Sequence, residues 1–154
     1  NLSSWRWLSG VTCKTWERYS VHILEPMIRL LGPGFVSVQL ESRPGIEVAH
    51  LAHSSGVQIT VPVIHDGAAS FGALQVCGTG APVTLQMNDT YTAFRRQIVA
   101  FVDYVRSGLL PFPFSETIEL MAAVLAGMRS AAQGSRRVAL AEIYSELSWS
   151  PLHP

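Results

Sequence analysis

Apolar residues recur every three or four positions from Thr15 to Leu31, which predicts an amphipathic helix at the start of the chain. Gly32-Pro33-Gly34 follows and ends this helix with both residue types that stop helices. Pro26 lies inside the pattern and predicts a kink or the end of a first helical segment.

From Phe35 to Met87 the hydrophobic period changes to two, which predicts strands. The expected strands are Phe35–Glu41, Ile46–His53, Val57–Ile64, Ser70–Cys77 and Val83–Met87. The turns between them are short, so antiparallel pairing is favoured over parallel pairing, which needs long crossovers. A turn at Ser55-Gly56 would place His50 opposite Val61 and His65 opposite Ile46.

The period returns to that of a helix after Met87. Asn88 or Asp89 is expected to cap a helix that ends at Ser107-Gly108. Its apolar stripe consists of Tyr91, Phe94, Ile98, Phe101, Val102 and Val105. Ser115 is expected to cap a further helix that runs to Gly134, and Arg137–Leu140 to form a last short strand. The order predicts an α+β domain with an open, mostly antiparallel sheet and helices on one face.

Charge is sparse along the chain and unevenly distributed. The 154 residues carry 11 Lys plus Arg against 11 Asp plus Glu, and from Val48 to Asn88 Asp66 is the one formally charged residue. This balance argues against disorder, and against nucleic-acid binding, which needs clustered positive charge. No apolar run approaches the about 20 residues of a membrane span. The chain begins without Met or a signal-peptide pattern, so we expect a cytoplasmic fragment or processed form.

Metal and phosphate motifs are weak in this sequence. His50 and His53 point to opposite faces of their strand, and His65 is expected about 13 Å from His50 at the usual strand rise, so no metal site is expected. Gly78-Thr79-Gly80 leads back into a strand rather than into a helix, and no P-loop or G-x-S-x-G is present. Cys13 and Cys77 lie far apart and are expected to be buried, reduced thiols.

One polar stripe of the first helix is a candidate site. His22 shares it with Arg18, Glu25 and Arg29, at spacings of three or four residues. A solvated face with an ordinary Glu25–Arg29 pair would explain the stripe equally well. Aromatic and cationic residues gather beside it, however, and such a group can bind a polyhydroxylated or anionic small molecule. The candidate substrate-binding residues are Arg6, Lys14, Trp16 and Tyr19.

Three segments together resemble the C-terminal domain of the Gfo/Idh/MocA (glucose–fructose oxidoreductase / inositol dehydrogenase) family. Tyr19–Glu25 with Leu31-Gly32 resembles the family's G-x-H-x-x-(D/E) helix and its closing glycine. Phe94–Gly108 resembles the helix before the family's short G-x-x-P connector. Ser115 through Leu140 resembles the closing segment with its A-x-x-S-x-x-x-G-x-x-V-x-L pattern.

The resemblance implies that residues 1–154 form one substrate-binding and oligomerisation domain of an oxidoreductase of sugars, inositols or related alcohols. The full-length protein would use NAD or NADP held by an N-terminal Rossmann domain, which this chain lacks. That domain would be a partner in cis or in trans, and no cofactor is expected for this chain alone. His22 would be the catalytic residue, because imidazole exchanges protons near neutral pH.

Two departures from the family pattern leave an alternative open. Arg18 stands where the family has an aspartate before the histidine, and the catalytic lysine of its Glu-Lys-Pro motif belongs to the absent half. The chain could therefore be a non-catalytic ligand-binding or scaffold module, or an unrelated α+β domain. In every case the charge-poor sheet is expected to bury its second face against another subunit, as in a homo-oligomer such as a dimer.

Overall fold

The computed structural model describes residues 4–68, 73–87 and 89–147. Helices and strands follow in the order β1 (Trp5–Gly10), β2 (Thr12–Cys13), α1 (Trp16–Leu31), β3 (Phe35–Arg43), β4 (Ile46–His53), β5 (Gln58–Ile64), β6 (Ala73–Gly78), β7 (Val83–Gln86), α2 (Thr90–Ser107), α3 (Phe114–Ala132), β8 (Val138–Ala139) and α4 (Leu140–Glu146). The predicted α+β class is confirmed.

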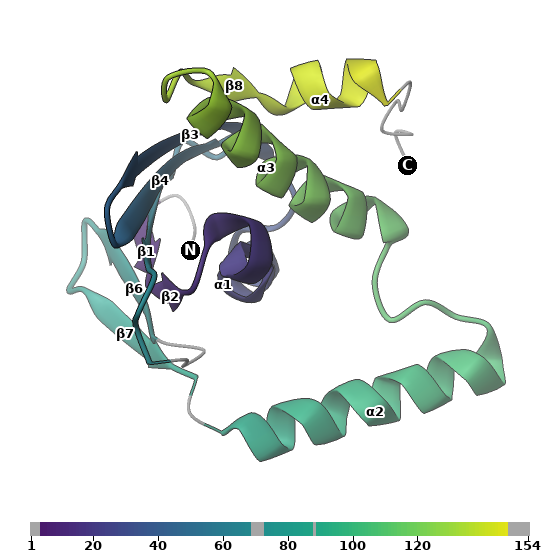
Figure 1. Ribbon diagram of the computed structural model, residues 1–154. Helices are drawn as coiled ribbons and strands as arrows, with labels where there is room; N and C mark the ends of the chain where they lie inside the picture. The colour runs from purple at the N-terminus through teal and green to yellow at the C-terminus, as the bar shows by residue number, and fades with distance from the viewer. Residues whose placement is uncertain (1–3, 69–72, 88, 148–154) are drawn as a thin grey trace.

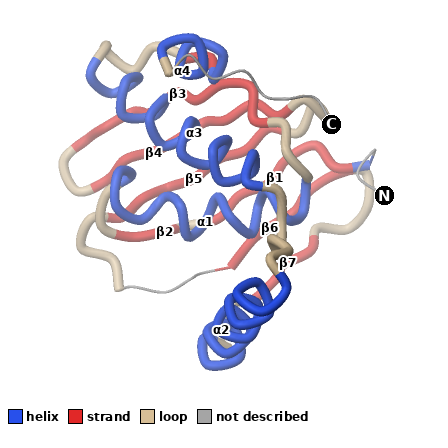
Figure 2. Tube along the Cα trace, turned by 90° about the vertical axis from the view of Figure 1, so that its right-hand side faces the viewer, coloured by secondary structure: helices blue, strands red, loops and turns tan. Residues whose placement is uncertain are grey.

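All strands join one open sheet, with α1 and α3 on the same face (Figures 1 and 2). The strand order is β7-β6-β1-β5-β4-β3-β8, and β2 also pairs with β5. The pairs along β6-β7, β1-β6 and β5-β4-β3-β8 are antiparallel, whereas β1 and β2 run parallel to β5. The sheet is therefore mostly antiparallel, as predicted.

The sequence pattern did not predict β1. This strand inserts between β5 and β6, so two strands that follow each other in the chain are not neighbours in the sheet. A bulge between Trp5 and Trp7 interrupts its alternation, which hides the period of two. Leu8 then points into the core, while Trp7 lies on the other face, where its indole N–H donates a 3.1 Å hydrogen bond to Thr60 Oγ1.

The predicted register of β4 and β5 is wrong by one residue. His50 pairs with Thr60 rather than Val61, and Ile46 pairs with Ile64 rather than His65. The loop holds three residues, not two: His53 N donates to the carbonyl of Val57, and Gly56 has a φ of 87°. A three-residue hairpin loop with glycine in the left-handed region is a common solution, and it shifts every pair by one.

The first helix fills the centre of the core. Ile23, Leu24, Met27 and Ile28 are buried against the sheet, as the predicted stripe requires. Pro26 does not end the helix, which continues to Leu31. Proline has no N–H to donate to the carbonyl of His22, so the helix loses one hydrogen bond at this position. The helix nevertheless continues past it.

The C-terminal third departs from its predicted ends. Asp89 caps α2 by accepting from Thr92 N at 2.9 Å, as expected, whereas Asn88 lies outside the described residues. Ser115 is not a cap but lies inside α3, whose N-cap is Pro113. The last strand is only Val138–Ala139, and Leu140 begins α4, which was not predicted because it is short and buries only Leu140 and Ile143.

The sheet face away from α1 and α3 is made of uncharged side chains on its central strands. The strand registers place these residues on it: Trp7, Ser9, Ile46, Val48, His50, Ala52, Gln58, Thr60, Pro62, Ile64, Gln75 and Cys77. None of them is Asp, Glu, Lys or Arg, whereas Glu41 and Arg43 of β3, which pair with Val48 and Ile46, lie at the edge of the same face. We call this surface the open face. Cys77 belongs to it and is only partly buried, while Cys13 is buried, and both thiols are free.

Candidate functional site

The exposed side of α1 carries the candidate site. His22 is exposed there, and its ring packs edge-on against Tyr19 with 5.2 Å between ring centroids. Arg18 and Glu25 are exposed on the same helix. The structure therefore places an imidazole, a phenol and charged groups at one surface on the helix side of the sheet.

A carboxylate from the sheet holds the start of this helix. Glu47 Oε2 accepts a 2.7 Å hydrogen bond from Trp16 N and lies 3.4 Å from His65 Nε2. Because the N-terminus of a helix carries partial positive charge, a carboxylate there stabilises it. Sequence reasoning missed Glu47, which lies on the same inward face of β4 as the buried Ala49 and Leu51. Glu47 thus positions α1, and with it His22, relative to the sheet.

Arg29 holds the other end of the same stripe. It forms a 2.9 Å ion pair with Glu116 of α3, and its guanidinium lies 4.5 Å from the ring centroid of Phe112. An ordinary Glu25–Arg29 ion pair was the alternative explanation of this stripe. In the structure, Arg29 instead contacts α3 and the linker that precedes α3. Arg29 ties α1 to α3, while Arg18, His22 and Glu25 remain at the surface.

The predicted substrate-binding residues fall into different surroundings. Tyr19 contacts His22 directly. Lys14 is exposed two residues ahead of α1, with a φ of 67°. Arg6 is exposed on β1, where its Nη1 donates to the carbonyl of Trp5. Trp16 is 1% exposed, and its indole N–H donates to Val124 O at 2.9 Å, so the structure gives it a packing role.

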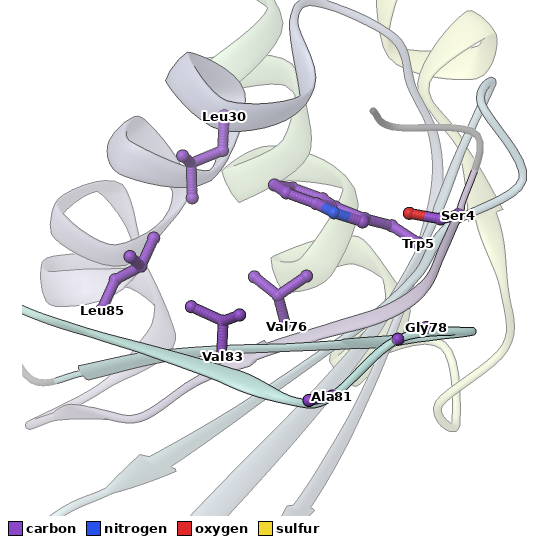
Figure 3. A pocket seen from close by; sticks show the side chains of 9 residues that line it. Ser4, Trp5, Leu30, Val76, Gly78, Ala81, Val83 and Leu85 are labelled. Carbon is purple, nitrogen blue, oxygen red and sulfur yellow. The ribbon is translucent and has the colours of Figure 1, made fainter.

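A cavity of about 300 Å³ lies elsewhere, between the end of α1 and the β6–β7 hairpin (Figure 3). Trp5, Leu30, Val76, Val83 and Leu85 supply its apolar wall, and Ser4 is the polar side chain beside them. Leu30 is eight residues beyond His22, or about 12 Å along a helix. None of the described residues that line it has an ionisable side chain, so these residues supply no group for acid–base chemistry.

Neither a metal-ligand cluster nor a dinucleotide cradle is formed by the residues that the structure describes. Within residues 4–68, 73–87 and 89–147, no three His, Cys, Asp or Glu side chains gather closely enough to hold a metal ion. Gly78-Thr79-Gly80 joins two antiparallel strands, whereas a dinucleotide cradle joins a strand to a helix. The residues here therefore do not fit NAD. In the same described ranges no helix combines the length and apolar character needed to cross a bilayer.

Solved structures supply the comparison. The chain matches myo-inositol dehydrogenase from Lactobacillus casei, in complex with NAD(H) and myo-inositol, with a TM-score of 0.72 and 15% identity over 88% of this chain and 54% of that one. The fold is that of a Gfo/Idh/MocA C-terminal domain. No family model matches the sequence, and no curated protein does.

Two other solved structures give the same result for this Gfo/Idh/MocA-type fold. Myo-inositol 2-dehydrogenase from Lactobacillus plantarum matches with a TM-score of 0.72 and 16% identity over 90% of this chain and 57% of that chain. An oxidoreductase from Agrobacterium radiobacter, in complex with NAD+, L-tartaric acid and magnesium, matches with a TM-score of 0.70 and 14% identity over 90% and 58%. The chain thus spans a little over half the length of these proteins.

Proposed function

We propose that this chain is the substrate-binding and assembly half of an NAD(P)-dependent oxidoreductase that acts on a sugar, an inositol or a related alcohol. The observation that carries the proposal is His22, exposed on α1 with its ring against Tyr19, in a fold similar to that of an inositol dehydrogenase in complex with NAD(H). Dinucleotide binding belongs to a Rossmann domain, in cis or in trans, because the described residues of this chain form no strand-to-helix glycine loop.

In this proposal His22 handles the proton of the substrate. Oxidation of an alcohol removes a hydride from carbon, which the dinucleotide accepts, and a proton from oxygen. His22 takes that proton at a ring nitrogen, and it returns the proton in the reverse direction. Tyr19 limits the orientation of the imidazole through the edge-on ring contact. Lys14 and Arg6 are the proposed cations for a small polar substrate, and buried Trp16 contributes by fixing α1.

Arg18 motivates a second candidate function. An arginine four residues before His22 cannot accept a hydrogen bond from imidazole as a carboxylate does. The carboxylate that would adjust the proton affinity of this histidine in the family pattern is therefore missing. A non-catalytic ligand-binding or scaffold module would retain the fold and the open face without turnover. The two functions differ in whether any alcohol is oxidised.

The open face supports the assembly part of the proposal. The central strands of this face present uncharged side chains. A sheet face that stays in water usually carries polar and charged side chains instead. We propose that a second copy covers this face in a homo-oligomer, with a dimer as the simplest form. The two free cysteines fit a reducing, cytoplasmic location.

Calorimetry and an activity assay test this function together. The chain alone should give no binding heat with NAD+ or NADP+, while a polypeptide that also carries the dinucleotide-binding domain should bind one of them. That polypeptide should reduce the dinucleotide in the presence of a polyol from a panel of inositols and sugars. Tight dinucleotide binding by the chain alone would overturn the domain assignment. Dinucleotide binding without turnover of any polyol would favour the scaffold function.

A further inference from the structure

Helix α2 carries a row of large apolar side chains that are more than half exposed. Tyr91, Phe94, Ile98, Phe101 and Val105 are 78, 57, 61, 60 and 66% exposed, and no residue of α2 is buried. Their spacing of three, four, three and four residues is that of the contact positions along a two-helix seam. We call these five residues the α2 seam. A seam of this kind is suited to one helix laid alongside it.

The placement of α2 restricts what can cover the seam. Figures 1 and 2 show α2 standing away from α1 and α3 while remaining on the helix side of the sheet. Both of its ends are tied to the body, one by β7 and the other by a linker whose Phe112 contacts Arg29 of α1. A helix held at both ends is not a free arm that can be exchanged with another copy. Its partner must come to the helix side, where the surface of α1 that bears His22 is also exposed.

We infer that the α2 seam is the docking surface for the dinucleotide-binding domain, with one amphipathic helix of that domain packed along it. This inference rests on the proposed function. The solved structures that share the fold are nearly twice as long as the part matched by this chain, which leaves room for such a domain. Doubly wound dinucleotide-binding domains carry helices on both faces of their sheet, and so supply the kind of partner that a two-helix seam requires.

Docking on α2 has a consequence for the site on α1. A domain seated along the seam lies on the same side of the sheet as His22 and Tyr19, so its bound dinucleotide is brought toward them. The open face, on the other side of the sheet, stays available for a second copy. One surface therefore serves the reaction and the other serves assembly.

Amide hydrogen exchange of α2 tests the inference. In the chain alone, the amides around Ile98 should exchange quickly. When the dinucleotide-binding domain is present, ahead of Asn1 or as a separate chain, they should exchange at least tenfold more slowly. Ile98→Glu and Phe101→Glu should abolish this protection, because each puts a charge into the seam. Ala93→Glu adds the same charge on another side of α2 and should retain it. Both seam positions are exposed, so the variants should melt as the unaltered chain does.

The outcomes separate this inference from the proposed function. If the two-domain polypeptide binds NAD but the amides of α2 exchange as fast as in the chain alone, the inference is wrong and the proposed function stands. If no dinucleotide binds at all, both are wrong. If protection of α2 rises with the concentration of the chain alone and disappears in Ile98→Glu, a second copy covers the seam and the inference is overturned.

Discussion

The indole N–H of Trp16 donates a 2.9 Å hydrogen bond to the carbonyl oxygen of Val124, which joins the first turn of α1 to the middle of α3. The indole lies so close to Gly127 that a Cβ there would be 2.2 Å from Trp16 Nε1. The glycine is therefore required by the tryptophan. Together they set the separation of the two helices that cover the sheet.

Gly127→Ala should destabilise the fold although alanine is the better helix former. Helix propensity favours alanine by about 1 kcal/mol, but overpacking a rigid indole costs about 1–3 kcal/mol in the free energy of unfolding. Gly80→Ala is the control, because nothing lies within 4 Å of a Cβ added there. Urea unfolding monitored by circular dichroism measures both variants. Equal midpoints would contradict the packing described for Trp16.

Glu142 should give stability that acid removes. Hydrogen bonds from Arg136 and then from Ala139 N lower the pKa of this carboxyl from its ordinary 4.5 to about 2. In the unfolded chain Glu142 takes up its proton near pH 4.5, whereas in the folded chain it does so only near pH 2. Its contribution is therefore complete above pH 4.5 and is lost as the pH falls toward 2.

Thermal unfolding of Glu142→Gln at several pH values checks this linkage. The variant should melt below the unaltered chain at pH 6, and the gap should close between pH 4.5 and pH 2. Glu25→Gln, on the exposed side of α1, is the matched control. A gap for Glu142→Gln that stays constant down to pH 2 would show that the ion pair with Arg136 contributes nothing.

A charge in the middle of the open face should separate the proposed subunits. His50 lies on β4 directly between Gln39 and Thr60, both uncharged, so His50→Glu places a carboxylate inside the open face. Burying it against a second copy without a partner is unfavourable, and we expect the apparent dissociation constant of the oligomer to rise at least tenfold. Glu17→Lys on α1 should leave it unchanged. Sedimentation that shows a monomer of the unaltered chain at high concentration would contradict assembly through this face.

The sequence predicted those parts of the fold whose pattern is local. Strand β4 was predicted with its observed ends because glycine-containing turns flank it, and α1 within one residue because it buries a regular apolar stripe. Strand β1 was missed because its bulge breaks the alternation and its parallel partner β5 lies some fifty residues away. The one-residue register error came from loop geometry at Gly56, which the hydrophobic pattern does not contain.

The candidate site shows the same division between local and distant information. Tyr19 and His22 are three apart on one helix, so their contact follows from helical geometry. Trp16 is also three residues from Tyr19, but its indole is buried and donates to α3 instead of facing the surface. Glu47 and Glu116, which hold the two ends of α1, come from other elements of the fold. Nothing in the sequence around His22 indicates either of them.

Turnover by a His22→Ala variant tests the central claim most directly. In the polypeptide that carries both domains, kcat for polyol oxidation should fall about a hundredfold, the low end of general acid–base catalysis, and the pH dependence attributable to the imidazole should disappear. Glu25→Gln, one turn along the same exposed side of α1, should change kcat much less. Unchanged turnover and an unchanged pH profile in His22→Ala would contradict the assignment of proton transfer to α1.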